Sequence, residues 1–246
     1  MARQRTPEGP PPPPPVQKLR IRYAKRGRLR FSSTRDFQRA LERALRRADV
    51  PMAYSAGFHP HPKISYTNAA PTGTASEAEF FEISVIERLD PQAVRAALDA
   101  ALPEGLDVLA AVEAPPGSLA DRLQAGDWVL ELRDATPEQA AAWEAAWDAF
   151  RGHDHIEVAR MTKSGERRFD VRAAVVRVER SPEHEADGSY AVRMILRHTT
   201  PAVRPDDVLR GLRIVAPGLP AADPVATRLL QGPLTEDGQA TDPLAD

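Results

Sequence analysis

The order in which strand-like and helix-like hydrophobic patterns follow one another along the sequence constrains the fold of this chain most. Residues 19–24 alternate apolar side chains with mostly basic ones, as a half-buried strand does, and residues 35–48 place apolar side chains at helical spacing behind Ser33. Alternation resumes at residues 64–68 and 80–86, a second helical pattern covers residues 91–101, and residues 106–112 favour another strand. The predicted order is strand, helix, strand, strand, helix, strand.

That order is typical of the ferredoxin-like split βαβ unit, in which two helices cover one face of an antiparallel sheet. The second half repeats it more loosely, with strands predicted at residues 128–132, 156–161, 169–178 and 190–196, helices at 137–150 and 205–212, and a last strand at Ile214 and Val215. An extra element is expected around residues 172–179. Trp143 and Trp147 are expected in the core or at a contact between domains, with a platform for base stacking as the alternative. We therefore predict an α+β protein of two tandem ferredoxin-like halves.

Composition predicts that both ends of the chain are disordered. Residues 1–15 include a proline run, and residues 219–246 combine acidic side chains with Pro, Gly, Ala and Thr and little apolar periodicity. A boundary is expected near residues 114–117. The predicted domains are therefore residues 16–114 and 115–218, between a proline-rich N-terminus and an acidic tail.

Several classes of protein are disfavoured by what the sequence lacks. The chain has no cysteine, which excludes disulfides, thiolate zinc sites, cysteine nucleophiles and cysteine-bound iron–sulfur clusters. No apolar run reaches the roughly 20 residues of a membrane helix, and no secretion signal is recognisable, so we expect a cytoplasmic protein without membrane contact. No glycine-rich phosphate loop, Gly-x-Ser-x-Gly or dinucleotide fingerprint is present, so no cofactor and no catalysed reaction is predicted.

Positive charge is concentrated near the start of the chain. Residues 18–47 contain twelve lysines and arginines against Asp36 and Glu42, a charge of about +10, whereas the whole chain carries −2. Guanidinium groups bind phosphate in bidentate fashion, which predicts contact with a polyanion. The alternative is a solvated helix face, or pairing with acids of the same chain. The predicted phosphate contacts are Arg20, Arg39, Arg43, Arg46, Arg47 and Lys63.

A stiff loop follows the basic helix at residues 57–63, with the sequence Gly-Phe-His-Pro-His-Pro-Lys. Its prolines fix the backbone while its glycine permits unusual dihedral angles. Tyr54, Phe58, His59 and His61 are the predicted contacts to a base, sugar or other ligand. A structural turn with Phe58 in the core is the alternative, and acid–base catalysis by a histidine is a further one.

Two other groups of polar residues are of types that can carry chemistry. His59 and His61, with His153 and His155, form two His-x-His pairs that could converge on a metal, but no third-ligand pattern accompanies them, so no metal site is predicted. Glu77 and Glu79 precede a predicted strand. Salt bridges to the arginine helix are their expected role, with general-base duty as the alternative.

Four short motifs carry a resemblance to a known family. They are Phe-Ser-Ser-Thr-Arg-Asp-Phe at residues 31–37, Arg-Ala-Leu-Arg-Arg-Ala at 43–48, Tyr-Ser-Ala-Gly-Phe-His-Pro-His-Pro-Lys-Ile-Ser at 54–65 and Gly-Thr-Ala-Ser-Glu-Ala-Glu at 73–79. With them the chain resembles the radical SAM-linked protein family. The resemblance implies a bacterial accessory domain of undefined activity, free-standing or attached to radical SAM proteins. It also implies that genes of this family often lie near genes for RNA processing or translation.

The predicted architecture is similar, more distantly, to the CRISPR RNA endoribonucleases of the RAMP superfamily. No Cys-x-x-x-Cys-x-x-Cys motif is present, so the chain cannot hold a radical SAM cluster of its own. The leading hypothesis is an RNA-binding accessory protein in tRNA or rRNA processing or modification. One alternative is a protein–protein adaptor for a radical SAM enzyme, and another is a metal-independent endoribonuclease that uses His59 or His61.

Overall fold

The computed structural model describes residues 11–162, 165–186 and 188–245, and it divides the chain into two units, Met1–Ala120 and Asp121–Asp246. The division falls six residues after the predicted boundary between residues 114 and 115. Ten strands and five α-helices are present in the described residues, so the protein is of mixed α+β type, as predicted. No helix of the described residues combines the length and the apolar character that crossing a membrane requires.

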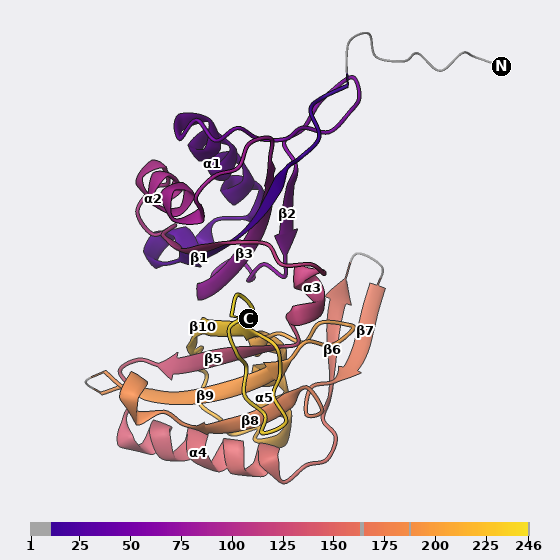
Figure 1. Cartoon of the computed structure of the whole chain (residues 1–246). Helices are drawn as coiled ribbons and strands as arrows, with labels where there is room; N and C mark the ends of the chain where they lie inside the picture. Colours follow the sequence, from indigo (N-terminus) through magenta and orange to yellow (C-terminus); the bar gives the residue numbers. More distant parts are fainter. Residues whose placement is uncertain (1–10, 163–164, 187, 246) are drawn as a thin grey trace, which may run out of the picture. The chain divides into compact units, whose positions relative to one another are not determined.

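The first unit has the predicted order of elements (Figure 1). Its elements are β1 (Gln17–Lys25), the 3-10 helix η1 (Gly27–Phe31), α1 (Thr34–Arg47), β2 (Ile64–Thr67), β3 (Ala75–Val85), α2 (Pro91–Ala101) and β4 (Val108–Glu113). The strands lie in the order β4-β1-β3-β2, and each pair is antiparallel.

One face of this sheet and the two helices form the core of the first unit. Leu19 and Ile21 of β1 are fully buried and lie opposite Ile83 and Phe81 of β3, as the alternating pattern predicts. Apolar side chains of α1 and α2 pack against them, and the ring of Phe37 stacks on that of Tyr23 with 4.1 Å between centroids. Burial of this apolar face fixes α1 against the sheet and leaves its other face to the solvent.

The second unit contains a four-stranded sheet and a separate hairpin. Its elements are α3 (Leu119–Arg122), which spans the division, β5 (Ala125–Leu132), α4 (Pro137–Arg151), β6 (Glu157–Thr162), β7 (Gly165–Asp170), β8 (Val175–Arg180), the 3-10 helix η2 (Pro182–His184), β9 (Tyr190–Arg197), α5 (Pro205–Val215) and β10 (Val225–Gly232). The sheet order is β10-β5-β9-β8, and β6 pairs with β7. Trp143 and Trp147 are buried in its core, as predicted.

Two predicted strands of this unit differ from the structure. Residues 169–178 are divided between β7 and β8, because the Asp170 carboxylate accepts the backbone N–H groups of Ile156 and Arg172, at 3.0 and 2.9 Å, and the chain turns there. Ile214 and Val215 form the end of α5 instead of a strand. The last strand of the sheet comes later in the chain.

That strand lies in the segment predicted to be a disordered tail. Residues 225–232 form β10 and pair with β5, whose backbone groups would otherwise lack partners on that side. The chain then folds back on its unit: the Leu234 N–H donates to Gln124 Oε1 at 3.0 Å, and Arg122 donates to the Ala245 carbonyl at 2.6 Å. Of the predicted disordered N-terminus, residues 11–15 have no regular secondary structure, and residues 1–10 lie outside the described chain.

Candidate nucleic-acid interface

Helix α1 presents the arginine-rich face that the sequence predicts. A capping box begins it: the Asp36 N–H donates to Ser33 Oγ at 3.2 Å, and the Asp36 carboxylate accepts the Ser33 N–H at 3.0 Å. These hydrogen bonds with Ser33 lower the pKa of Asp36. The buried side of the helix holds its apolar residues, and the opposite side exposes Arg35, Arg39, Arg43 and Arg46.

Local acids compensate these four guanidinium groups only weakly: the charge of Arg39 contributes to the lowered pKa of Asp36. In the part of the chain that the structure describes, their side chains form no hydrogen bond or ion pair. Arg47 is also exposed, but it donates to the Ala101 carbonyl at the end of α2, at 2.9 Å. Of the predicted phosphate contacts on α1, Arg39, Arg43 and Arg46 are therefore free to meet an anion, and Arg35 joins them.

Arg20 does not belong to this surface, and its predicted contact with phosphate is wrong. Its side chain is 1% exposed, and its Nε donates to Glu82 Oε1 at 2.7 Å while Nη2 donates to the Gly117 carbonyl at 2.6 Å. The alternation of β1 placed Arg20 correctly on the face away from the helices. At Arg20 this face of the sheet is shielded from the solvent, so the positive charge is paired inside the protein.

Pairing also removes Arg26 from the basic surface. Its guanidinium forms ion pairs with Glu77 of β3 and with Asp107 next to β4, the latter at 2.6 Å. The hydrogen bond with Glu77 raises the pKa of Arg26 further above its ordinary value. Glu77 thus has the salt-bridging role that was expected, although its partner lies before α1 and not on it.

The loop between α1 and β2 holds the other predicted contacts. An isolated bridge joins Tyr54 to Pro62, and the Ser55 N–H donates to the His61 carbonyl at 2.9 Å, so the loop closes like a hairpin. Gly57 has a φ of +128° at its tip, a conformation that favours glycine.

The side chains of this loop point to the solvent. Phe58 is 60% exposed and Tyr54 is 41% exposed, so the alternative that buried Phe58 in the core is wrong. His59, His61 and Lys63 are exposed as well. The loop thus gathers two aromatic rings, two imidazoles and one ammonium group within ten residues of chain.

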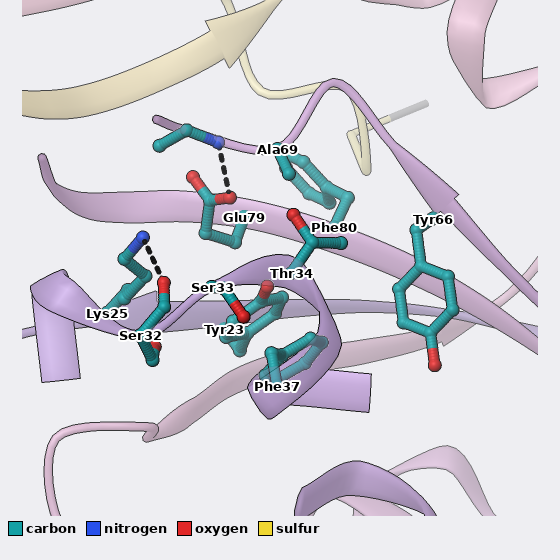
Figure 2. Close-up of a pocket in the computed structure, with 11 residues that line it drawn as sticks. Tyr23, Lys25, Ser32, Ser33, Thr34, Phe37, Tyr66, Ala69, Glu79 and Phe80 are labelled. Atoms are coloured by element: carbon teal, nitrogen blue, oxygen red, sulfur yellow. Dashed lines mark hydrogen bonds between the residues drawn. The ribbon is translucent and has the colours of Figure 1, made fainter. Parts of the chain in front are cut away.

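A small polar recess that the sequence patterns above do not predict lies in the same unit, at the start of α1 (Figure 2). Its lining includes the polar side chains of Lys25, Ser32, Ser33, Thr34, Tyr66 and Glu79. We call it the polar recess. Lys25 is 5% and Glu79 is 1% exposed, although both bear a formal charge. Burial, with the charge of Glu42, raises the pKa of Tyr66 to about 12.

The sequence did contain a signal for this recess. Lys25 continues the inward-facing series of Leu19, Ile21 and Tyr23, and Glu79 lies opposite Tyr23 in the register of β1 and β3. A charged residue at the inward end of an apolar alternation is unusual, because burying charge is costly. That pattern in both strands marks the recess.

All four histidines of the two His-x-His pairs are exposed. Among the described residues, no group of three or more His, Cys, Asp or Glu side chains is arranged to hold a metal ion. His59 and His61 belong to the first unit, whereas His153 and His155 belong to the second. In the second unit, His155 Nδ1 lies 3.2 Å from a carboxylate oxygen of Asp170.

Comparison with known proteins gives a family without an assigned activity. A family model described as an uncharacterised protein conserved in bacteria, DUF2344, matches residues 18–205. The chain belongs to this family. The match to DUF2344 begins in β1 and ends at the first residue of α5, so it includes α1, the loop and the polar recess. No curated protein matches the chain.

Proposed function

We propose that this DUF2344 protein binds RNA in the cytoplasm, as an accessory factor in the processing or modification of tRNA or rRNA. One observation carries the proposal: α1 exposes four arginines that have no ion pair in the described chain. Guanidinium groups match the geometry of phosphate oxygens, and a row of them binds a nucleic-acid backbone with little regard for sequence.

The loop at residues 54–63 adds side chains that can contact bases, which the arginines of α1, as phosphate contacts, do not provide. Phe58 and Tyr54 offer exposed rings on which an unpaired base stacks, and such stacking is worth about 1–3 kcal/mol per base. His59 and His61 offer hydrogen-bonding groups beside them. A single-stranded or looped RNA fits this combination, since its bases are open to stacking.

We also propose that both units are ferredoxin-like, in tandem. The strand orders β4-β1-β3-β2 and β10-β5-β9-β8 support this interpretation, with the β6–β7 hairpin as an insertion after α4. The distant similarity to RAMP endoribonucleases depends on this architecture. Fold alone does not give function, so the RNA proposal depends on the arginines.

Replacing Arg35, Arg39, Arg43 and Arg46 together by Gln is expected to weaken binding of a single-stranded RNA about equally for every sequence. Each phosphate contact contributes about 0.7 to the slope of log affinity against log salt, so the slope is expected to fall by about 2 to 3. Filter binding between 50 and 200 mM salt, a range of about fourfold, measures this slope.

The matched control replaces Arg133, Arg168, Arg177 and Arg180 by Gln, which removes the same charge from arginines of the second unit that pair with acids. This control is expected to retain most of the salt dependence. A wild-type protein with no affinity for RNA, or with an affinity that ignores salt, contradicts the proposal. Equal losses in the two quadruple variants contradict the assignment to α1.

A second candidate function is supported by the exposed aromatic rings of the loop. Aromatic side chains are enriched at protein interfaces, so Phe58 and Tyr54 also suit an adaptor that docks on a radical SAM enzyme. Co-purification with such an enzyme after nuclease treatment, lost on Phe58→Ser, supports the adaptor. No observation supports the endoribonuclease alternative, because neither His59 nor His61 forms a hydrogen bond with a carboxylate that would orient its ring in the described chain.

A further inference from the structure

We propose that the RNA strand bound along α1 stacks a second base on Phe31, so that the protein takes a single strand of about nine unpaired nucleotides with a stacked base near each end. The inference rests on the proposed function and adds the class of RNA that the surface fits. It follows from the exposure of Phe31, from the cations beside its ring and from the distance between this ring and the loop at residues 54–63.

Phe31 is an exposed aromatic side chain directly before α1. It ends the 3-10 helix η1, three residues ahead of Thr34, and it is 58% exposed, much as Phe58 is in the loop. A single exposed apolar side chain is ordinary on a protein surface. The groups around the ring therefore decide whether it is a binding site.

The backbone at Gly73 lies beside this ring. The Gly73 N–H donates to the Arg30 carbonyl at 2.8 Å, and Gly73 has a φ of +92°, a conformation that favours glycine. A Cβ at Gly73 would lie 3.8 Å from the Phe31 ring, so glycine keeps a further side chain away from it. Two of the four short motifs, residues 31–37 and 73–79, thus meet at this ring.

Two cations of η1 lie near the ring without an acid to pair with. The guanidinium carbon of Arg30 lies 4.7 Å from the Phe31 ring centroid, which is a cation–π contact. Across the described residues, the side chains of Arg28 and Arg30 form no hydrogen bond or ion pair, and Arg30 Nε is buried without a hydrogen-bond partner. Buried donors of this kind are rare in native proteins. The cation–π contact orients Arg30 and leaves its charge available to a phosphate.

A ring with unpaired guanidinium groups beside it matches the two parts of a nucleotide. The base stacks on an aromatic ring or on a guanidinium plane, and the phosphate meets the positive charge. Arg35 follows Phe31 by four residues, so their Cα atoms are at most about 14 Å apart. A strand whose phosphates contact Arg35 and Arg39 therefore brings a neighbouring base to Phe31.

The Phe31 ring and the loop lie at opposite ends of β3. Gly73, beside Phe31, comes two residues before β3 begins at Ala75, whereas the Ala53 N–H, directly before the loop, donates to the Ser84 carbonyl at 2.8 Å. The strand from Ala75 to Ser84 covers about 30 Å. At a rise of about 3.4 Å per nucleotide, an RNA strand needs about nine nucleotides to reach from one end to the other. The bases of a duplex are not open to stacking, so the expected ligand is single-stranded.

The test compares a trinucleotide, which reaches one ring at a time, with a dodecanucleotide, which reaches both, by fluorescence anisotropy. Phe31→Ser is expected to weaken binding of the dodecanucleotide about fivefold to 150-fold, the loss of one stacked base. Its salt slope is expected to stay that of the wild type, because no charge is removed. The trinucleotide still binds at the loop, so a smaller loss is expected for it.

Two further variants serve this test. Phe31→Leu keeps an apolar side chain and removes the aromatic face, so it is expected to show most of the loss of Phe31→Ser. Ile214→Ser is the matched control: Ile214 of α5 is 56% exposed and lies in the second unit, and both affinities are expected to stay unchanged.

The result that overturns the inference differs from the one that overturns the proposed function. A Phe31→Ser or Phe31→Leu protein that binds the dodecanucleotide as tightly as Ile214→Ser overturns the contact with Phe31 and leaves backbone binding by α1 intact. Equal losses for the trinucleotide and the dodecanucleotide overturn the strand that spans both rings. A wild-type protein with no affinity for either RNA overturns the proposed function itself.

Discussion

Glu82→Gln is expected to lower the free energy of unfolding by about 3–5 kcal/mol at neutral pH, because it leaves the guanidinium of Arg20 buried without a counter-charge. The Arg20 side chain is 1% exposed and that of Glu82 is 9% exposed, with 2.7 Å between Nε and Oε1. Lys18 adds a second cation at 3.3 Å from the other carboxylate oxygen. Urea unfolding followed by far-ultraviolet circular dichroism measures the change.

The same pair predicts how this loss depends on pH. Burial raises the pKa of Glu82, but the hydrogen bond from Arg20 and the charge of Lys18 outweigh burial, so the folded pKa lies below the ordinary value of 4.5. A carboxyl group with a depressed folded pKa stabilises the protein above its unfolded pKa, and this contribution is lost as the pH falls through the folded value. The difference between wild type and Glu82→Gln should therefore be full at pH 7 and shrink below about pH 4.5.

The exposed pair of Arg177 and Glu179 provides the control. Both side chains are 46% exposed, and the hydrogen bond from Arg177 Nη2 is 2.7 Å long. Surface pairs of this kind contribute about 0–1 kcal/mol, so Glu179→Gln is expected to leave stability nearly unchanged. A Glu82→Gln protein as stable as this control at pH 7 contradicts the interpretation of Arg20 as a paired, structural cation.

Local sequence patterns predicted the first unit well, because its elements are defined by their own residues. The Ser33–Asp36 capping box and the apolar spacing of residues 37–45 set α1 within one residue of its observed ends, Thr34 and Arg47. The exposed arginines follow from the same helical periodicity. These features depend on residues close in sequence, which a pattern can report.

Features that depend on contacts between residues far apart in the sequence could not be predicted from local patterns. Alternation showed which face of β1 carries Arg20, but not that Glu82 and the Gly117 carbonyl cover it. The composition of residues 219–246 indicated disorder, yet β10 is stabilised by pairing with β5, about one hundred residues earlier. The polar recess joins β1, α1 and β3, so it appears only once the register of the strands is known.

Asp207→Ala is expected to cost about 3–5 kcal/mol and to loosen the β6–β7 hairpin, because it removes a buried acid that fixes three parts of the second unit. Asp207 is 1% exposed; it forms ion pairs with Arg160 of β6 and with Arg210, and it accepts the Arg204 N–H at 3.0 Å before α5. Arg160 in turn lies 5.0 Å from the ring centroid of Phe169 on β7. Without Asp207, a largely buried guanidinium lacks its counter-charge and α5 loses a cap.

Hydrogen exchange of the amides in β6 and β7, together with urea unfolding, tests this expectation. Faster exchange in the two strands of the hairpin is expected for Asp207→Ala, since Arg160 no longer ties β6 to the start of α5. Asp206→Ala is the matched control: Asp206 occupies the same turn but is exposed, so only a few tenths of a kcal/mol from the helix dipole are at stake. Equal stability and equal exchange in the two variants would show that the hairpin is held by its apolar contacts and not by the buried acid.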